Sequence, residues 1–279
     1  MKKSLLCLVL IYFLLVNLTS AQDPEPACAC AQPEFIVELG GKLKLNYKEI
    51  NICTMDDGSI LLQDRDTDKY YIVKGGVTQG PLEEEDPRIA GFANCYPYSM
   101  SMDDMLLRYK GILSKSGEKY LITVGGKSYG PFIEIAEFNI TRSKEKFVAI
   151  AYDKEGEMPK LFTNIPNATF DIVNTINAGM CVGIKYDEIL IVTETKILNF
   201  QGKTLLNIKP EMSGCGTVFI NTTNTRSAYY DGDALVFSDN TVLPNLFNPH
   251  LIKTGSTVYL AYMFYSPKRK AIMQCKIPF

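Results

Sequence analysis

Short runs of β-branched and aromatic residues alternate with polar turns along most of the chain. Val, Ile, Tyr, Phe and Thr dominate these runs, and Gly, Asn or Asp pairs separate them, which is typical of strands joined by tight turns. Clear helical spacing is not found; residues 100–108 come closest and are expected to form a helical turn or a loop. The sequence therefore predicts an all-β protein with strands at residues 35–39, 60–63, 70–74, 120–124, 146–152, 188–193, 217–221, 234–238 and 257–265.

Two segments of the chain resemble each other closely. Residues 70–81 read YYIVKGGVTQGP and residues 120–131 read YLITVGGKSYGP, an offset of 50 residues. Each has an aromatic residue, alternating apolar residues and a Gly-Gly pair, which suits a hairpin turn because glycine adopts positive φ at little cost. The closing Gly-Pro ends the second strand, since proline cannot donate to the ladder. The pattern predicts two copies of one β-hairpin.

Weaker copies of this strand–turn–strand pattern follow at residues 160–164, 196–202 and 234–240. The central apolar residues of the five copies are Ile72, Ile122, Phe162, Leu198 and Val236, with steps of 50, 40, 36 and 38 residues. A period near 40 built only from strands favours a β-propeller with about four strands per blade.

Residues 35–279 then form about six blades, with seven as an alternative. A further unit is expected to begin at Ile36, and the last strand, residues 271–278, is expected to close against it. An irregular β-sandwich with a duplicated hairpin is the alternative fold, although a single sandwich is usually smaller.

Residues 125–162, GGKSYGPFIEIAEFNITRSKEKFVAIAYDKEGEMPKLF, resemble one blade of the TolB-like propeller repeats of exported bacterial proteins. Such blades carry a Gly-Lys-x-Tyr-Gly-Pro hairpin, a strand, a Ser-x-Asp-Gly-Lys turn and an apolar strand. Residues 143–146, Ser-Lys-Glu-Lys, stand at the turn but lack its Asp-Gly. The resemblance implies the propeller fold, and fold alone does not imply function.

The N-terminal 21 residues have the order of a secretory signal peptide. Lys2 and Lys3 precede an apolar run at residues 5–16, and Thr-Ser-Ala at residues 19–21 supplies a cleavage site. The run is shorter than the roughly 20 residues that a membrane-spanning helix needs. Residues 22–34, rich in Pro and Ala, are expected to be a flexible tether. The mature protein is therefore expected in the periplasm or at the cell surface, without a transmembrane segment.

Charge and cysteine content narrow the class of protein further. The chain has 29 basic and 31 acidic side chains, and loss of Lys2 and Lys3 takes the net charge from −2 to −4. That balance argues against a nucleic-acid partner, because proteins that bind nucleic acids normally have a basic face. Seven of eight cysteines remain after removal of Cys7. Exported proteins often pair their cysteines, and an odd number leaves at least one outside an intramolecular pair.

Four cysteines fall in the first strand-like run of successive units: Cys53, Cys95, Cys181 and Cys215. The first strand of each blade lines the channel of a propeller, so these residues are candidates for disulfides 53–95 and 181–215. The alternative is that each is a small buried apolar residue.

Catalytic motifs are weak throughout the sequence. The one histidine, His250, follows Asn-Pro and is expected in a surface loop, so a Ser-His or Cys-His site has little support. Paired carboxylates in a channel mouth would suit a glycan hydrolase, but the acidic run at residues 83–86 more closely resembles a solvated loop.

Metal sites have similarly little support. Cys28 and Cys30 are too close for the usual zinc spacing and lie in the expected tether. Asp64, Asp66 and Asp68 imitate the start of a calcium loop but lack its glycine and its bidentate glutamate, so a solvated hairpin turn is expected instead. We therefore predict no metal and no cofactor.

Tyrosine-rich loops are the best candidates for contact with a ligand or partner, because tyrosine supplies amphipathic contact area. They contain Tyr96 and Tyr98, and Tyr229 and Tyr230, which could equally be packing residues. The sequence favours an exported, non-catalytic binding or protein-interaction module whose partner is a protein or glycan. A carboxylate-based glycan hydrolase and a structural cell-envelope component are the alternatives.

Overall fold

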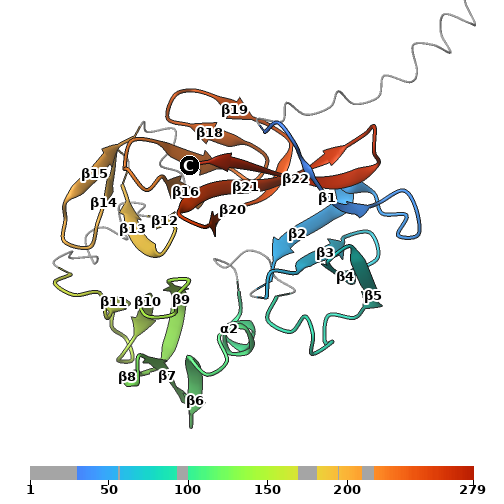
Figure 1. Ribbon diagram of the computed structural model, residues 1–279. Coiled ribbons are helices and arrows are strands. Elements are labelled where there is room, and N and C mark those ends of the chain that lie inside the picture. The colour runs from blue at the N-terminus through green and yellow to red at the C-terminus, as the bar shows by residue number, and fades with distance from the viewer. Residues whose placement is uncertain (1–29, 56, 93–99, 169–180, 194, 209–216) are drawn as a thin grey trace, which may run out of the picture.

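A computed structural model describes residues 30–279 of the protein, apart from residues 56, 93–99, 169–180, 194 and 209–216 (Figure 1). Strands dominate this part of the chain, and its helices are the 3₁₀ turn η1 (Tyr47–Glu49) and the helix α2 (Met102–Arg108). Ser101 begins α2 by accepting a hydrogen bond from the Asp104 amide. The prediction of an all-β protein is confirmed, and residues 100–108 contain its α-helix.

The first three sheets are antiparallel meanders, in which each strand pairs with the next along the chain (Figure 1). The first contains β2 (Ile50–Thr54), β3 (Ile60–Asp64), β4 (Lys69–Lys74) and β5 (Val77–Leu82). The second contains β6 (Leu113–Ser116), β7 (Lys119–Val124) and β8 (Lys127–Phe132). The third contains β9 (Glu134–Ile140), β10 (Phe147–Tyr152) and β11 (Lys160–Thr163).

Two further meanders of four strands form one sheet, because their first strands pair with each other. One comprises β12 (Cys181–Lys185), β13 (Glu188–Val192), β14 (Lys196–Leu198) and β15 (Thr204–Asn207). The other comprises β16 (Thr217–Ile220), β17 (Ser227–Tyr230), β18 (Leu235–Phe237) and β19 (Val242–Leu243). The pairing of β12 with β16 is parallel, whereas the pairs within each meander are antiparallel.

The two ends of the described chain meet in the last sheet, which we call the closing sheet. It contains β20 (Leu246–Thr254), β21 (Thr257–Ser266), β22 (Ala271–Pro278) and the N-terminal strand β1 (Glu34–Glu38). Strand β1 pairs antiparallel with β22, with Glu34 opposite Gln274 and Glu38 opposite Ala271. The prediction that residues 271–278 close against the first strand is confirmed.

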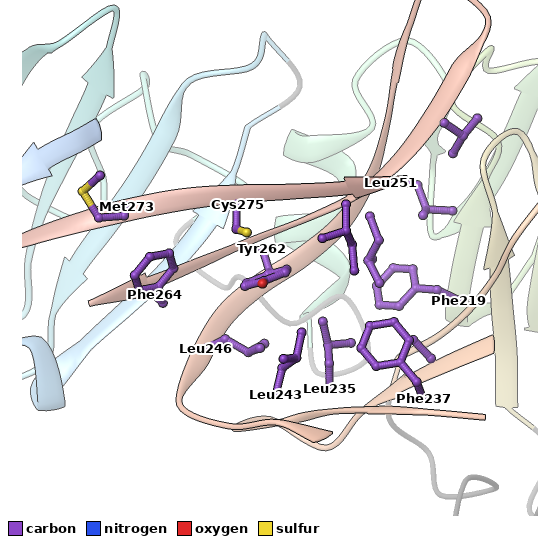
Figure 2. Packing of buried hydrophobic residues seen from close by; sticks show 14 of the residues in the cluster. Phe219, Leu235, Phe237, Leu243, Leu246, Leu251, Tyr262, Phe264, Met273 and Cys275 are labelled. Atoms are coloured by element: carbon purple, nitrogen blue, oxygen red, sulfur yellow. The ribbon is translucent and has the colours of Figure 1, made fainter. Parts of the chain in front are cut away.

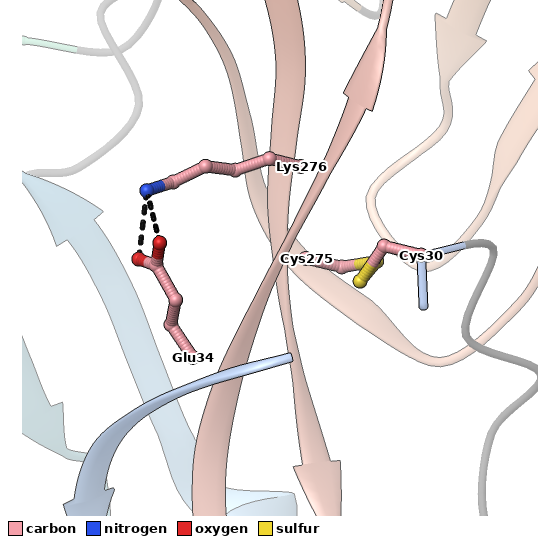
Figure 3. Close-up of a disulfide and its surroundings, with 4 residues drawn as sticks. All are labelled: Cys30, Glu34, Cys275 and Lys276. Carbon is pink, nitrogen blue, oxygen red and sulfur yellow. Dashed lines mark hydrogen bonds and ion pairs between the residues drawn. A yellow bond between two sulfur atoms is a disulfide. The ribbon is translucent and has the colours of Figure 1, made fainter. Parts of the chain in front are cut away.

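A disulfide and an ion pair join β22 to the N-terminal segment (Figure 3). Cys30 is bonded to Cys275, and Lys276 Nζ lies 2.6 Å from Glu34 Oε1. Neighbouring residues of a strand point to opposite faces, so the two contacts extend from opposite sides of β22. The predicted tether at residues 22–34 is therefore wrong at its C-terminal end, because residues 30–34 are tied into the closing sheet.

The two similar hairpins have the same register. In the hairpin β4–β5, Ile72 pairs with Gln79 and Lys74 pairs with Val77. In β7–β8, Ile122 pairs with Tyr129 and Val124 pairs with Lys127. Each residue of the second hairpin lies 50 positions after its counterpart in the first. The Gly-Gly pairs form the turns, and all four glycines have positive φ. Gly80 and Gly130 follow at equivalent places, also with positive φ.

The segment that resembles one blade, residues 125–162, is divided between two sheets. Its Gly-Pro hairpin strand, β8, belongs to the second sheet, whereas β9, β10 and β11 form the third. Residues 143–146 do form the expected turn between β9 and β10. The expectation that this segment is one structural unit is therefore wrong, because the turn after Phe132 ends one sheet and begins the next.

Hydrophobic clusters lie between successive sheets rather than at a single centre. Phe138 and Phe147 of the third sheet pack with Ile122 and Phe132 of the second. Further clusters join the third sheet to the β12–β15 meander, that meander to β16–β19, and β16–β19 to the closing sheet. Figure 2 shows the last of these, where Phe219 and Phe237 face side chains of β20 and β21.

The closing sheet also packs on the first sheet. Met263 and Ile272 contact Ile52 and Leu62, so the last sheet in the chain covers one face of the first. Strand β21 is consequently covered on both faces, and residues 260–264 are all buried. This explains why they form an unbroken apolar run instead of an alternating one.

Candidate functional site

The predicted tyrosines do not form a common surface in the described structure. Tyr96 and Tyr98 lie outside the described residues. Tyr229 packs against the cluster of Val218 and Ile220, whereas Tyr230 packs against the cluster of Figure 2. The Tyr230 hydroxyl lies 2.7 Å from the Gly232 carbonyl oxygen and 3.1 Å from that of Leu246, and it can donate to either. The contacts of Tyr229 and Tyr230 are therefore those of packing residues.

The predicted cysteine pairs can be followed only in part. Cys53, on β2, is buried and disulfide-bonded, and its expected partner Cys95 lies outside the described residues. The Cys53 sulfur is 3.8 Å from the carbonyl oxygen of Phe92, three residues before Cys95. Cys181 is the first residue of β12, and Cys215 lies outside the described residues.

The Cys30–Cys275 disulfide was not predicted. Cys30 was expected to lie in the tether without a metal role, whereas its sulfur is bonded to Cys275. A signal was nevertheless present in the sequence. If residues 271–278 pair with a strand that begins near Ile36, a cysteine shortly before that strand lies beside the last strand.

Asp64, Asp66 and Asp68 lie in the turn between β3 and β4, as expected. Asp64 accepts hydrogen bonds from the Asp66 amide at 3.2 Å and from the Thr67 hydroxyl at 2.6 Å. Its carboxylate therefore stabilises the turn itself. Within the described residues, no group of three or more His, Cys, Asp or Glu side chains is arranged to hold a metal ion.

Arg142, Tyr186 and Lys253 come together from three different sheets. Arg142 follows β9, Tyr186 follows β12, and Lys253 lies near the end of β20. The Arg142 guanidinium carbon is 5.7 Å from the centroid of the Tyr186 ring, and Lys253 Nζ is 5.8 Å from the same centroid. Both distances are in the range of cation–π contacts. We call these three residues the Tyr186 cluster.

Hydrogen bonds between loops hold the Tyr186 cluster together. Arg142 Nη1 donates to the Leu251 carbonyl oxygen at 3.2 Å and so joins the third sheet to the closing sheet. The Ser143 amide donates to Asp187 Oδ1 at 2.8 Å and joins the turn after β9 to the turn after β12. The three loops are thus connected directly, and their side chains have defined positions.

The two cations of the cluster lie at the surface of the protein. In the part of the chain that the structure describes, neither Arg142 nor Lys253 forms an ion pair, and both side chains are exposed. Asp187 Oδ1 already accepts a hydrogen bond from the Ser143 amide. Glu188 Oε2 lies 3.7 Å from Lys185 Nζ and so forms an ion pair with that lysine. Two cations therefore share one aromatic ring without a carboxylate partner.

His250 lies within strand β20, so the expectation of a surface loop is wrong. A register shift between Phe247 and His250 lets Asn248 and Pro249 remain within the strand. The Nδ1 atom is 2.9 Å from the Asn248 carbonyl oxygen, an acceptor, so Nδ1 carries a proton. Burial lowers the pKa of His250 below 6.5, and the charges of Arg142 and Lys276 lower it further.

Sequence reasoning did not find this cluster, because its members are far apart in the chain and none belongs to a motif. The available signal was their position: Arg142 and Tyr186 each come directly after the first strand of a strand unit. In a propeller, the residues that follow the first strand of each unit lie together at one end of the channel. That placement was the signal in the sequence that could have brought Arg142 and Tyr186 together.

No known family model matches the chain, and no curated protein matches it either. Over the described residues, none of the helices combines the length and apolar character that crossing a membrane requires.

Proposed function

We propose that the mature chain is an exported, six-bladed β-propeller that acts as a non-catalytic binding module. The partner is a ligand or a protein held where loops of several blades meet. The observation that carries this function is the meeting of Arg142, Tyr186 and Lys253 from three sheets. Arg142 and Lys253 are exposed, and among the described residues neither forms an ion pair. Loops positioned by a rigid scaffold are the usual place for binding.

Three features support the propeller. The strands form six successive meanders, if the eight-stranded sheet is counted as two and the closing sheet as one. Clusters join each meander to the next from the second to the last, and one joins the last meander to the first. The first strands β12 and β16 run parallel, as they must when every blade starts at a central axis and runs outward. The TolB-like resemblance also favours a propeller, although residues 125–162 extend over two sheets.

Closure of the last blade by β1 has a simple physical purpose. A ring of sheets without a shared strand can open between its first and last members. Here β1 comes from the start of the chain and completes the sheet built by the end of the chain. The Cys30–Cys275 disulfide also supports export, because such bonds persist in oxidising compartments.

A carboxylate-based hydrolase has less support than a binding module. Burial raises the pKa of Glu137 on β9, which would suit a general acid. No second carboxyl group contributes to that shift, whereas glycoside hydrolysis needs two acids at roughly 5–10 Å. The described residues therefore support a general acid, Glu137, but not the pair of acids that the mechanism needs.

The test is a pull-down from cell-envelope extract with residues 22–279, compared with the variant Lys253→Ala. Lys115→Ala is the matched control, because Lys115 also lies over a tyrosine, 5.6 Å from the Tyr120 centroid. We expect a specific partner that is retained by the control and lost by Lys253→Ala. A protein that captures nothing and binds no small ligand would instead support the structural role. Release of sugars from glycans would favour the hydrolase.

A further inference from the structure

We infer that the Tyr186 cluster binds an oxyanion, namely a carboxylate or phosphate group carried by a small solute or an acidic saccharide. This inference rests on the proposed binding function and specifies its ligand class. The site consists of Arg142 and Lys253 as charged donors, with Tyr186 between the loops that present them.

Charge provides the first argument. Some exposed cations of this protein lie beside acids, as Lys69 does with Glu83 and Lys74 with Asp57. Arg142 and Lys253 differ from these because both lie over one ring, 5.7 and 5.8 Å from the Tyr186 centroid. Placing two unpaired cations near one ring produces a local positive potential, which an anion would neutralise.

Donor geometry provides the second argument. The Arg142 guanidinium has five N–H donors, and one atom, Nη1, is used on the Leu251 carbonyl oxygen. That hydrogen bond orients the planar group and leaves other donors for a ligand, which reduces the ordering cost of binding. Guanidinium groups match the paired oxygens of carboxylates and phosphates.

The surrounding groups do not compete for the same role. Asp187 keeps its negative charge, but its Oδ1 atom accepts from the Ser143 amide, so this carboxylate is oriented by the backbone. His250 has a lowered pKa and is neutral at pH 7, so it adds no charge there. The attraction for an anion therefore depends on Arg142 and Lys253.

Isothermal titration calorimetry at low ionic strength tests the inference with residues 22–279 and three probes. The probes are inorganic phosphate, galacturonate, and neutral galactose as the uncharged counterpart of galacturonate. We expect at least one anion to bind and galactose not to bind. Binding should weaken steeply as salt is raised, because the cations are exposed. The two anions distinguish a phosphate site from a carboxylate site.

Variants then locate the site. Lys253→Ala should weaken binding of the anion about tenfold, because it removes one charge-assisted contact. Lys115→Ala should leave affinity unchanged. Lys253 is exposed and makes no hydrogen bond that the protein needs for folding, so circular dichroism of Lys253→Ala should match the wild type.

Three results would overturn the inference. They are failure of wild type to bind either anion, equal binding of galactose, and equal loss of affinity in Lys115→Ala and Lys253→Ala. A partner that is still captured by Lys253→Ala in the pull-down would leave the binding module intact and reject the anion site alone. The two proposals can therefore fail separately.

Discussion

The closing sheet and the Tyr186 cluster both connect distant parts of the chain, but they do so by different means. The closing sheet joins residues 245 positions apart through a disulfide, and buried side chains cover β21 on both faces. The Tyr186 cluster joins three sheets through two hydrogen bonds and two cation–π contacts, with Arg142 and Lys253 exposed.

We propose that this difference separates contacts that stabilise the fold from contacts that bind a ligand. Contacts that are buried or covalent gain from removal of water and from constraint of the unfolded chain. Exposed charges contribute little to folding, because water solvates them well in either state. Their positions in the Tyr186 cluster are therefore better explained by a ligand than by stability. The predictions below test that contrast.

Loss of the terminal disulfide should have the largest effect. We expect Cys30→Ala to lower the free energy of unfolding by about 2–5 kcal/mol, because the bond closes a very long loop in the unfolded chain. Urea denaturation under oxidising conditions measures this. Reducing agent should then destabilise the wild type more than the variant. A variant as stable as wild type would contradict the role of the closing sheet.

A change confined to one hairpin, Gly130→Ala, should have a smaller effect than loss of the disulfide. A Cβ added at Gly130 would lie 2.9 Å from the Tyr120 carbonyl oxygen, at φ +115°. We expect Gly130→Ala to cost about 1–3 kcal/mol by this clash and strain. Gly125→Ala is the control, since it has positive φ but open space around its Cβ. Thermal unfolding should place Gly130→Ala clearly below Gly125→Ala; equal melting temperatures would rule out the clash.

Arg142→Ala should destabilise the protein less than either change above. It removes the hydrogen bond to Leu251, and an exposed charged donor of this kind is worth about 1 kcal/mol. The same variant should abolish anion binding in calorimetry. A loss of several kcal/mol in stability would show that Arg142 serves the fold and would weaken its assignment to the binding site.

His250 gives a pH-dependent test of the same region. Its folded pKa lies below the ordinary 6.5, so the unfolded chain binds its proton at higher pH than the folded chain does. Stability should therefore be unaffected above pH 6.5 and fall as pH decreases from 6.5 towards the folded pKa. Burial lowers this pKa most, the hydrogen bond to the Asn248 carbonyl opposes the shift, and the charges of Arg142 and Lys276 add to it.

The chain has one histidine, so His250→Gln removes the only side chain with an ordinary pKa in that range. We expect its stability to be flatter than that of wild type between pH 6.5 and about 5, by at most about 1.4 kcal/mol per pH unit. Parallel curves for the two proteins would show that His250 titrates normally.

Much of the fold could be predicted from the sequence, because strand patterns are local. All nine predicted strands overlap observed ones, and the Gly-Gly hairpins have equal registers. The single blade expected at residues 125–162 was wrong because a sequence repeat does not fix where one sheet ends. Its similarity begins in the hairpin of one sheet and continues into the next.

The candidate site was much harder to predict, because it depends on contacts between distant residues. Tyr229 and Tyr230 were chosen for their composition, yet their neighbours in space make them packing residues. Arg142 and Lys253 are ordinary exposed cations in the sequence. Their shared ring and their lack of acidic neighbours become visible only when β9, β12 and β20 are placed together.

The smallest effect is expected from the ion pair of the closing sheet. Lys276 Nζ is 2.6 Å from Glu34 Oε1, but over half of the Glu34 side chain is exposed, so the pair should contribute at most about 0.5 kcal/mol. Glu34→Gln should therefore change the urea midpoint only slightly, and less still at high salt. If Glu34→Gln lowered the free energy of unfolding as much as Cys30→Ala does, the ion pair would stabilise the closing sheet as strongly as the disulfide. The contrast between buried closure and exposed recognition would then no longer hold.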